Sequence, residues 1–202
     1  MWPPSLLLTL RISFGNVSAE VLGVDLKHWS EIPVPARLAR RPRDARGYPV
    51  PAAVLILEDG KPDFKVTDIH QWLALLKSRR CALCGEPLGR HLAFVGGPLS
   101  HKNRYFTDLP MHKECAQYAL QVCPYLAAPH FKYAEKIARR EGVSIETSGL
   151  VSPVRPEFFF LATTKSCEPA RGEDGTLLVH AAPWEHTEWW RNGERVERSD
   201  TA

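Results

Sequence analysis

Two short motifs constrain this chain more strongly than any other feature of its sequence. Cys81 and Cys84 form a Cys-x-x-Cys, and His112 and Cys115 form a His-x-x-Cys further along the chain. Thiolate sulfur and imidazole nitrogen are the usual ligands of structural zinc, and four of them in a tetrahedron complete its coordination. The sequence therefore predicts one structural Zn²⁺ ion bound by these four residues.

Each motif also has the local geometry that a pair of zinc ligands needs. Gly85 follows Cys84 directly and can adopt a positive φ angle, which lets the Cys-x-x-Cys fold as a knuckle around one ion. His112 and Cys115 are three residues apart, so the first turn of a helix presents both on one face. A knuckle, a β-hairpin and a ligand-bearing helix, in this order, predict a treble-clef-like zinc core. The alternative is a pair of buried cysteines beside an unrelated His-x-x-Cys.

Cysteine usage and hydropathy indicate the compartment. The chain has 202 residues and five cysteines, an odd number that favours metal binding over a set of disulfides. No basic residue precedes the apolar run 6–8, so we expect no signal peptide. No apolar run approaches the ~20 residues that span a bilayer. We therefore expect reduced thiols, a cytoplasmic location and no membrane partner. Cys123 is expected to be a core thiol, and Cys167 a bystander in a loop.

The pattern of apolar residues predicts an α+β fold, in which β-hairpins and three short helices flank the zinc core. The expected helices are 67–80, with Thr67 as N-cap, 111–123 and 130–141. The expected hairpins are 52–58 with 63–66, 91–95 with 103–107, and 189–196 around the turn Asn192-Gly193. Further strands are expected at 6–14, 158–162 and 177–180.

The chain divides into three parts by composition. Residues 1–35 form an N-terminal strand and variable segment, 36–142 a basic arm plus the zinc-binding core, and 143–202 a β-rich C-terminal part. We expect the last two to form one compact domain. The extended arm carries five Arg and one Asp at 36–46, whereas 142–202 carries six basic and ten acidic side chains. The zinc half is thus basic and the C-terminal part acidic, which favours an anionic partner or a dipolar surface.

Two surfaces are candidates for binding a partner. A nucleic acid would need Lys or Arg side chains at its phosphates, and the candidates are Arg37, Arg40, Arg41, Arg43, Arg46, Arg79, Arg80 and Arg104. A protein partner would favour exposed tryptophans, and the candidates are Trp184, Trp189 and Trp190. The plain alternatives are a solvated charged surface and a Trp pair that belongs partly to the core. Of these readings we favour protein interaction and retain nucleic-acid binding as the first alternative.

An enzymatic reading has less support from the sequence. An HNH-like metal-dependent nuclease, the second alternative, would need a general-base His on the hairpin and a second metal ligand on the helix. His91, His101 and Asn103 are present, but no Asp-His pair occurs, and the helix after Cys115 offers no further ligand. Four protein ligands also leave zinc no open position for a reacting water. We therefore expect no catalytic residues.

Several stretches together resemble an uncharacterised family of bacterial and bacteriophage proteins. They are 46–51, 60–64, 81–89, 91–98, 103–104, 112–119 and 123–126. The resemblance extends from Arg37 to the pair Trp189-Trp190 and implies a zinc-binding fold with no established activity. It also implies a bacterial or phage-infected cell. The first 35 residues and the short C-terminal end depart from this family.

Overall fold

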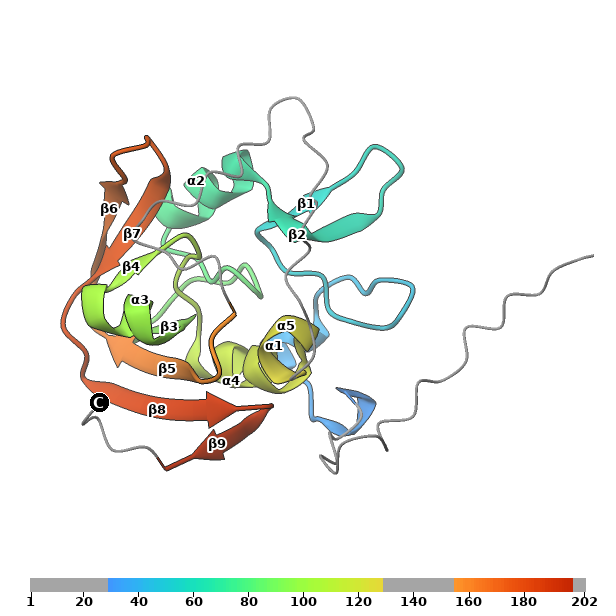
Figure 1. Ribbon diagram of the computed structural model, residues 1–202. Helices are drawn as coiled ribbons and strands as arrows, with labels where there is room; N and C mark the ends of the chain where they lie inside the picture. The colour runs from blue at the N-terminus through green and yellow to red at the C-terminus, as the bar shows by residue number, and fades with distance from the viewer. Residues whose placement is uncertain (1–28, 129–154, 198–202) are drawn as a thin grey trace, which may run out of the picture.

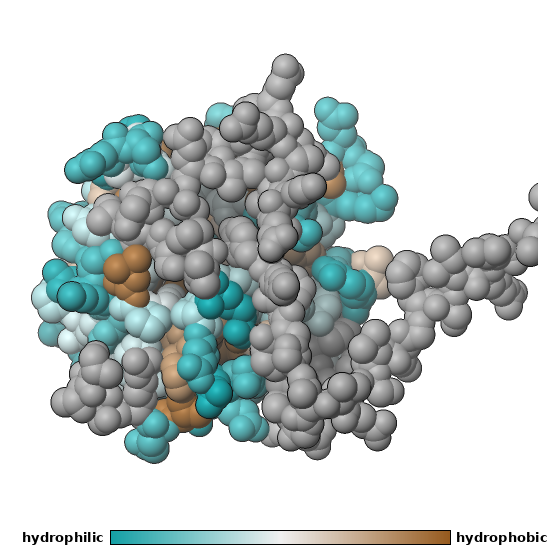
Figure 2. All heavy atoms as spheres, in the orientation of Figure 1, coloured by the Kyte–Doolittle hydropathy of each residue, from teal (hydrophilic) through white to brown (hydrophobic). Residues whose placement is uncertain are grey.

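The computed structural model describes residues 29–128 and 155–197, and shows a mixed helix-and-sheet protein with antiparallel sheets (Figure 1). The strand expected at 6–14 and the helix expected at 130–141 lie outside the described residues. Within the described part of the chain, every helix is too short or too polar to cross a membrane. In the view of Figure 2, hydrophilic side chains cover the tips of the hairpins β1–β2 and β6–β7.

The sheet with the most strands among the described residues is a four-stranded antiparallel sheet. Its order is β3 (Leu92–Gly96), β5 (Phe159–Thr164), β8 (His186–Arg191) and β9 (Glu194–Val196). All six residues of β5 are buried, as expected for a central strand with both faces covered. The predicted hairpin at 189–196 is confirmed, and Asn192 and Gly193 have φ angles of 50° and 81° in its turn.

A three-stranded antiparallel sheet has the order β4 (Tyr105–Phe106), β7 (Leu177–Ala181) and β6 (Cys167–Arg171). The predicted strand at 177–180 is confirmed, whereas the stretch around Cys167, which was expected to be a loop, forms β6 and contains Pro169. Proline is tolerated there because β6 is an edge strand. Cys167 consequently lies in a strand rather than in a loop.

The hairpin predicted between 91–95 and 103–107 is wrong. β3 pairs with β5, and β4 pairs with β7, so the two strands belong to different sheets. The helix α3 (Pro98–Asn103) occupies the place of the expected turn, because Pro98 is favourable in the first turn of a helix after the N-cap Gly97. Arg104 ends α3 with a φ angle of 60° and redirects the chain.

The predicted hairpin near 52–66 is confirmed as β1 (Val54–Ile56) and β2 (Pro62–Thr67). It leads into the predicted helix α2 (Ile69–Lys77), whose N-cap is Asp68 rather than Thr67. The Asp68 carboxylate accepts hydrogen bonds from the backbone N–H of His70 and Gln71, at 2.8 and 3.2 Å. Trp72 and Leu75 of α2 are buried in a cluster with Val179 of β7.

The helix predicted at 111–123 is confirmed as α4 (Lys113–Val122), and a further short helix α5 (Pro124–Ala127) follows. α4 packs against the four-stranded sheet through Leu120 and Tyr118, in one cluster with Leu161 and Trp190. A 3₁₀ turn (Trp29–Glu31) and the short helix α1 (Ala36–Ala39) precede the first hairpin. The segment expected to be an extended arm thus contains a helical turn, because Leu38 is buried in the same cluster.

Candidate metal centre

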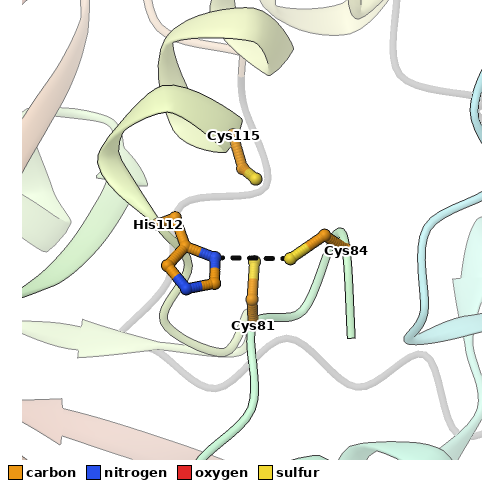
Figure 3. Close-up of side chains that lie close together, drawn as sticks. All are labelled: Cys81, Cys84, His112 and Cys115. Carbon is orange, nitrogen blue, oxygen red and sulfur yellow. Dashed lines mark hydrogen bonds between the residues drawn. The ribbon is translucent and has the colours of Figure 1, made fainter. Parts of the chain in front are cut away.

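Four side chains converge in the interior, beside the first turn of α4 (Figure 3). They are Cys81, Cys84, His112 and Cys115, each no more than 8% exposed. Their ligand atoms lie within 4.8 Å of one another, and Cys84 Sγ is 3.3 Å from His112 Nδ1. A tetrahedral zinc ion with bonds of about 2.3 Å to sulfur places neighbouring sulfurs about 3.8 Å apart. The spacing of the four ligand atoms therefore fits one ion.

The knuckle at Cys81–Cys84 is built by backbone hydrogen bonds, as predicted. Gly85 N–H donates to the Cys81 carbonyl at 2.9 Å, and Cys81 N–H donates to the Glu86 carbonyl at 2.9 Å. Gly85 has a φ angle of +75°, and a Cβ atom there would lie 3.2 Å from the Ala52 Cβ. Both the conformation and the close approach favour glycine after the second cysteine.

The other two ligands come from the start of α4. His112 is the N-cap residue and Cys115 lies in the first turn, so both point to the same side of the helix (Figure 3). Met111 and Ala93 exchange two backbone hydrogen bonds of 2.9 Å, which anchor this end of α4 to β3. The N-terminus of a helix also favours a thiolate over a thiol.

The Pro87 carbonyl orients the imidazole of His112. His112 Nε2 lies 3.0 Å from this oxygen. Because a carbonyl only accepts, Nε2 must carry a proton and donate it. In the neutral imidazole that binds a metal, this leaves the lone pair of Nδ1 on the side of Cys84 Sγ. Metal-bound histidines typically donate their second ring nitrogen in this way. The segment that carries Cys81 and Cys84 therefore supplies two ligands, and its Pro87 carbonyl also orients the ligand His112.

Ion pairs connect α1 to both ligand motifs. Arg37 Nη1 lies 2.6 Å from Glu86 Oε2, and Arg37 Nε lies 3.0 Å from Glu114 Oε1. Arg40 also pairs with Glu86. The hydrogen bonds from Arg40 and Arg37 lower the pKa of Glu86. These pairs are solvent-exposed and contribute little to stability individually, but they position α1 over the metal centre.

The thiols interact strongly with one another. A hydrogen bond from Cys115 lowers the pKa of Cys81 to about 5, and the same bond raises the pKa of Cys115. Burial raises the pKa of Cys84 to about 11. Three buried thiols therefore do not ionise together unless a cation compensates their charge, and a bound metal ion supplies that charge.

Comparisons with protein-family models, with curated proteins and with solved structures give no match for this chain. Its class is consequently defined by the site itself. Three thiols and one imidazole, all buried and within reach of one ion, form a site that can hold a metal. The structure thus supports a metal-binding protein with a Cys₃His centre.

The five arginines at 36–46 all contact the chain itself. Arg37 and Arg40 pair with Glu86, as described above. Each of the other three is held within this segment or by the residues just after it. Arg41 Nε donates to the Val50 carbonyl at 2.8 Å, Arg43 Nη1 donates to the Gly47 carbonyl at 2.7 Å, and Arg46 Nε lies 2.7 Å from Asp44 Oδ2.

The other three arginines considered for nucleic-acid binding differ in their surroundings. Arg80 Nη1 donates to the Gly85 carbonyl at 2.9 Å, and Arg104 Nε donates to the Ala181 carbonyl at 3.0 Å. Arg79 follows α2 with a φ angle of 52°. Its guanidinium has no hydrogen bond or ion pair to the residues that the structure describes.

The three tryptophans considered for protein binding belong largely to the core. Trp189 and Trp190 are each 7% exposed, on opposite faces of the four-stranded sheet. Trp184 is half-buried, and its Nε1 donates to the His101 carbonyl at 3.0 Å. The His101 ring stacks on Trp184 at 6.2 Å and lies 5.0 Å from Trp189. This aromatic cluster fixes the orientation of α3 on the sheet.

The three polar residues considered for a nuclease site are held by separate partners. His91 Nδ1 lies 3.0 Å from Glu185 Oε2, and the Asn103 side chain accepts a hydrogen bond from the Tyr105 N–H. His101 Nε2 lies 3.3 Å from Thr187 Oγ1. Within residues 29–128 and 155–197, the Cys₃His cluster is the one group of three or more His, Cys, Asp and Glu side chains placed to hold a metal.

A buried carboxylate that the sequence did not indicate lies against the first turns of α4. Glu188 of β8 is 4% exposed, and Lys113 Nζ lies 2.6 Å from its Oε1. His186 Nε2 approaches the same oxygen at 3.1 Å. Burial raises the pKa of Glu188, but the hydrogen bonds from Lys113 and His186 outweigh burial and lower it. The signal available was a Glu directly before the Trp pair of a strand.

Proposed function

We propose that the metal is zinc, that one ion is bound per chain, and that it stabilises the fold in a treble-clef-like arrangement. The single observation that carries this proposal is the buried set of four ligand atoms within 4.8 Å. Zinc is favoured because thiolate and imidazole ligands in a closed tetrahedron are typical of structural zinc. The order of knuckle, strand β3 and ligand-bearing helix α4 supports the treble-clef-like arrangement, although β3 and β4 do not pair as a hairpin between them.

The proposed zinc is a brace and not a catalyst. A catalytic zinc keeps one coordination position open for water, whereas four protein ligands fill the tetrahedral coordination sphere. Substitution of the metal by Co²⁺ tests this proposal. We expect the absorption spectrum of a tetrahedral thiolate complex, unchanged when azide or cyanide is added. A spectral change on adding either anion would reveal an open position and favour an enzyme.

We further propose that the protein acts by binding a protein partner in a reducing cytoplasm, where the thiols stay available to the metal. Ile56 and Phe64 lie on one face of the hairpin β1–β2 and are 51% and 40% exposed. Ile69 and Leu73, one turn apart on α2, are 47% and 46% exposed. Exposed apolar side chains of this kind favour protein interfaces. The resemblance to bacterial and bacteriophage proteins suggests a bacterial or phage-infected cell.

Nucleic-acid binding is the alternative, and the two readings predict different behaviour. The arginines at 36–46 all contact the chain itself, which leaves fewer cations free for phosphates. Binding of a protein partner should be lost in the double variant Ile69→Ser and Leu73→Ser, and it should persist at high salt concentration. Binding of a nucleic acid should be lost in the double variant Arg40→Ala and Arg41→Ala, and its affinity should fall steeply as the salt concentration rises.

A pull-down from a bacterial lysate, with and without nuclease, compares these variants. Leu99→Ser is the matched control, because Leu99 is 39% exposed on α3, away from the proposed surface. The proposal expects one specific protein that nuclease leaves bound and that the α2 double variant loses. Recovery that depends on nucleic acid would favour the alternative instead.

A further inference from the structure

A cavity of about 470 Å³ lies between α2 and the sheet that contains β6 and β7. Its walls are largely apolar, with Leu76 on one side and Ala170, Leu177 and Leu178 on the other. None of the four metal ligands lines it. Ligand-binding cavities have volumes of roughly 300–1,000 Å³ and are mostly apolar with a few polar groups. The size and lining of this cavity are therefore suitable for a small organic molecule.

Three cations and no described acidic side chain contribute to the lining. The cations are Lys77, Arg79 and Arg80, at the end of α2. Arg80 is engaged by the Gly85 carbonyl, at 2.9 Å. Lys77 and Arg79 have no hydrogen bond or ion pair to any residue that the structure describes. One end of an apolar cavity thus carries two cations that no described residue pairs, and their charge is complementary to an anionic group.

Arg79 is the residue best placed to select that group. Its φ angle of 52° is uncommon for a residue other than glycine, and it turns the chain sharply after α2. It also lies close to Cys167, a half-buried thiol of β6 that lines the same cavity. Burial raises the pKa of this thiol, and the charge of Arg79 opposes that rise. Arg79 and Cys167 therefore both border the same cavity.

We propose that this cavity binds a small amphipathic carboxylate, with its unbranched apolar chain between α2 and β6–β7 and its carboxylate on Arg79. A guanidinium matches the geometry of a carboxylate and forms two parallel hydrogen bonds with it. The chain removes apolar surface of both partners from water, so each added methylene should tighten binding about fourfold until the cavity is filled. None of the metal ligands lines this site, whereas Leu73 of α2 belongs both to its lining and to the proposed protein surface.

Calorimetric titration of the zinc-loaded protein with octanoate and with 1-octanol tests the proposal. The two probes share a chain and differ in charge, so we expect octanoate to bind at least tenfold more tightly. Arg79→Gln should abolish that preference, because glutamine keeps the polar character but not the charge. Arg90→Gln is the matched control, since Arg90 is an exposed arginine that does not line the cavity, and it should bind as the wild type does.

Two further measurements locate the ligand. Leu177→Trp, at a lining residue on the α2 side of the sheet, should fill part of the cavity and weaken octanoate binding, while zinc content stays as in the wild type. Octanoate should also slow the alkylation of Cys167 by iodoacetamide, followed by peptide mass spectrometry, in a protein with no substitution at all. The proposal is overturned by the absence of saturable octanoate binding, by equal affinity for octanol, or by octanoate binding that leaves Cys167 unprotected.

Discussion

The metal centre and the four-stranded sheet are held together by different forces, although α4 belongs to both. At the metal centre, three thiols and an imidazole are brought within 4.8 Å, an arrangement that is electrostatically costly without a cation. In the sheet, every residue of β5 is buried, and β3 and β8 flank it on both sides. The metal centre therefore needs a bound cation to be stable, whereas the four-stranded sheet is stabilised by the burial of its own residues.

Loss of a metal ligand should have the largest effect. Cys115→Ser removes a buried ligand from α4, and structural zinc in small domains contributes about 10 kcal/mol or more to folding. We expect no bound zinc, with rapid amide exchange at 81–88 and 36–50 and continued protection in β5 and β8. Hydrogen exchange followed by mass spectrometry measures both regions at once. Equal loss of protection in the two regions would show that the comparison is wrong.

Shortening a buried side chain of the sheet should have the opposite result, with lower stability and unchanged zinc content. Leu161 of β5 is fully buried, and Leu161→Ala should lower the free energy of unfolding by about 2–5 kcal/mol. Zinc should remain bound at one ion per chain in native buffer, because no ligand is touched. Urea denaturation together with metal analysis checks both statements. Ile56→Ala, at an exposed position, is the control and should change stability by less than about 0.5 kcal/mol.

Gly85→Ala should weaken the knuckle directly. The φ angle of +75° and the Ala52 Cβ at 3.2 Å both oppose a side chain at this position, at a combined cost of about 1–2 kcal/mol. A competition titration with a chelator should show zinc affinity reduced by roughly tenfold for each 1.4 kcal/mol lost. Gly89→Ala is the control, because a Cβ there meets no atom within 4 Å. Equal affinity of the two variants would contradict the account of the knuckle.

An effect of similar size is expected at the carboxylate between the two regions. Glu188→Gln loses the charge that faces Lys113 and should cost about 1–3 kcal/mol at neutral pH. The pKa of Glu188 is lowered in the folded protein, so its contribution is complete above the unfolded pKa and is lost as the pH falls through the folded value. Urea denaturation should therefore show the gap between wild type and variant narrowing on acidification. Glu157→Gln, at an exposed ion pair, should show no such gap.

The two regions also differ in how far the sequence predicts them. The metal centre follows from local spacing, since the ligands of each motif are only three residues apart and Gly85 marks the knuckle. The turns at Gly60 and Asn192-Gly193 are local in the same sense, and both were predicted. Strand pairing is not local. β3 pairs with β5 more than sixty residues later, and no pattern within 91–107 distinguishes that partner from β4.

Contacts between segments that are distant in sequence explain the other differences. The arginines at 36–46 look like a free basic surface in the sequence, but Glu86 and backbone carbonyls bind most of them. Trp189 and Trp190 look like an aromatic surface, yet alternation along β8 buries one on each face of the sheet. The cavity beside α2 requires β6, which looked like a loop around Cys167 and forms a strand only by pairing with β7. In each case the missing information was a partner from elsewhere in the chain.

Metal analysis of the purified protein tests the central claim most directly. Protein prepared without chelators should contain one zinc ion per chain by inductively coupled plasma mass spectrometry. Cys84→Ser should contain much less, whereas Cys167→Ser, at a cysteine outside the cluster, should keep the full amount. Near-zero metal in the wild type, or zinc that persists undiminished in Cys84→Ser, would contradict the account.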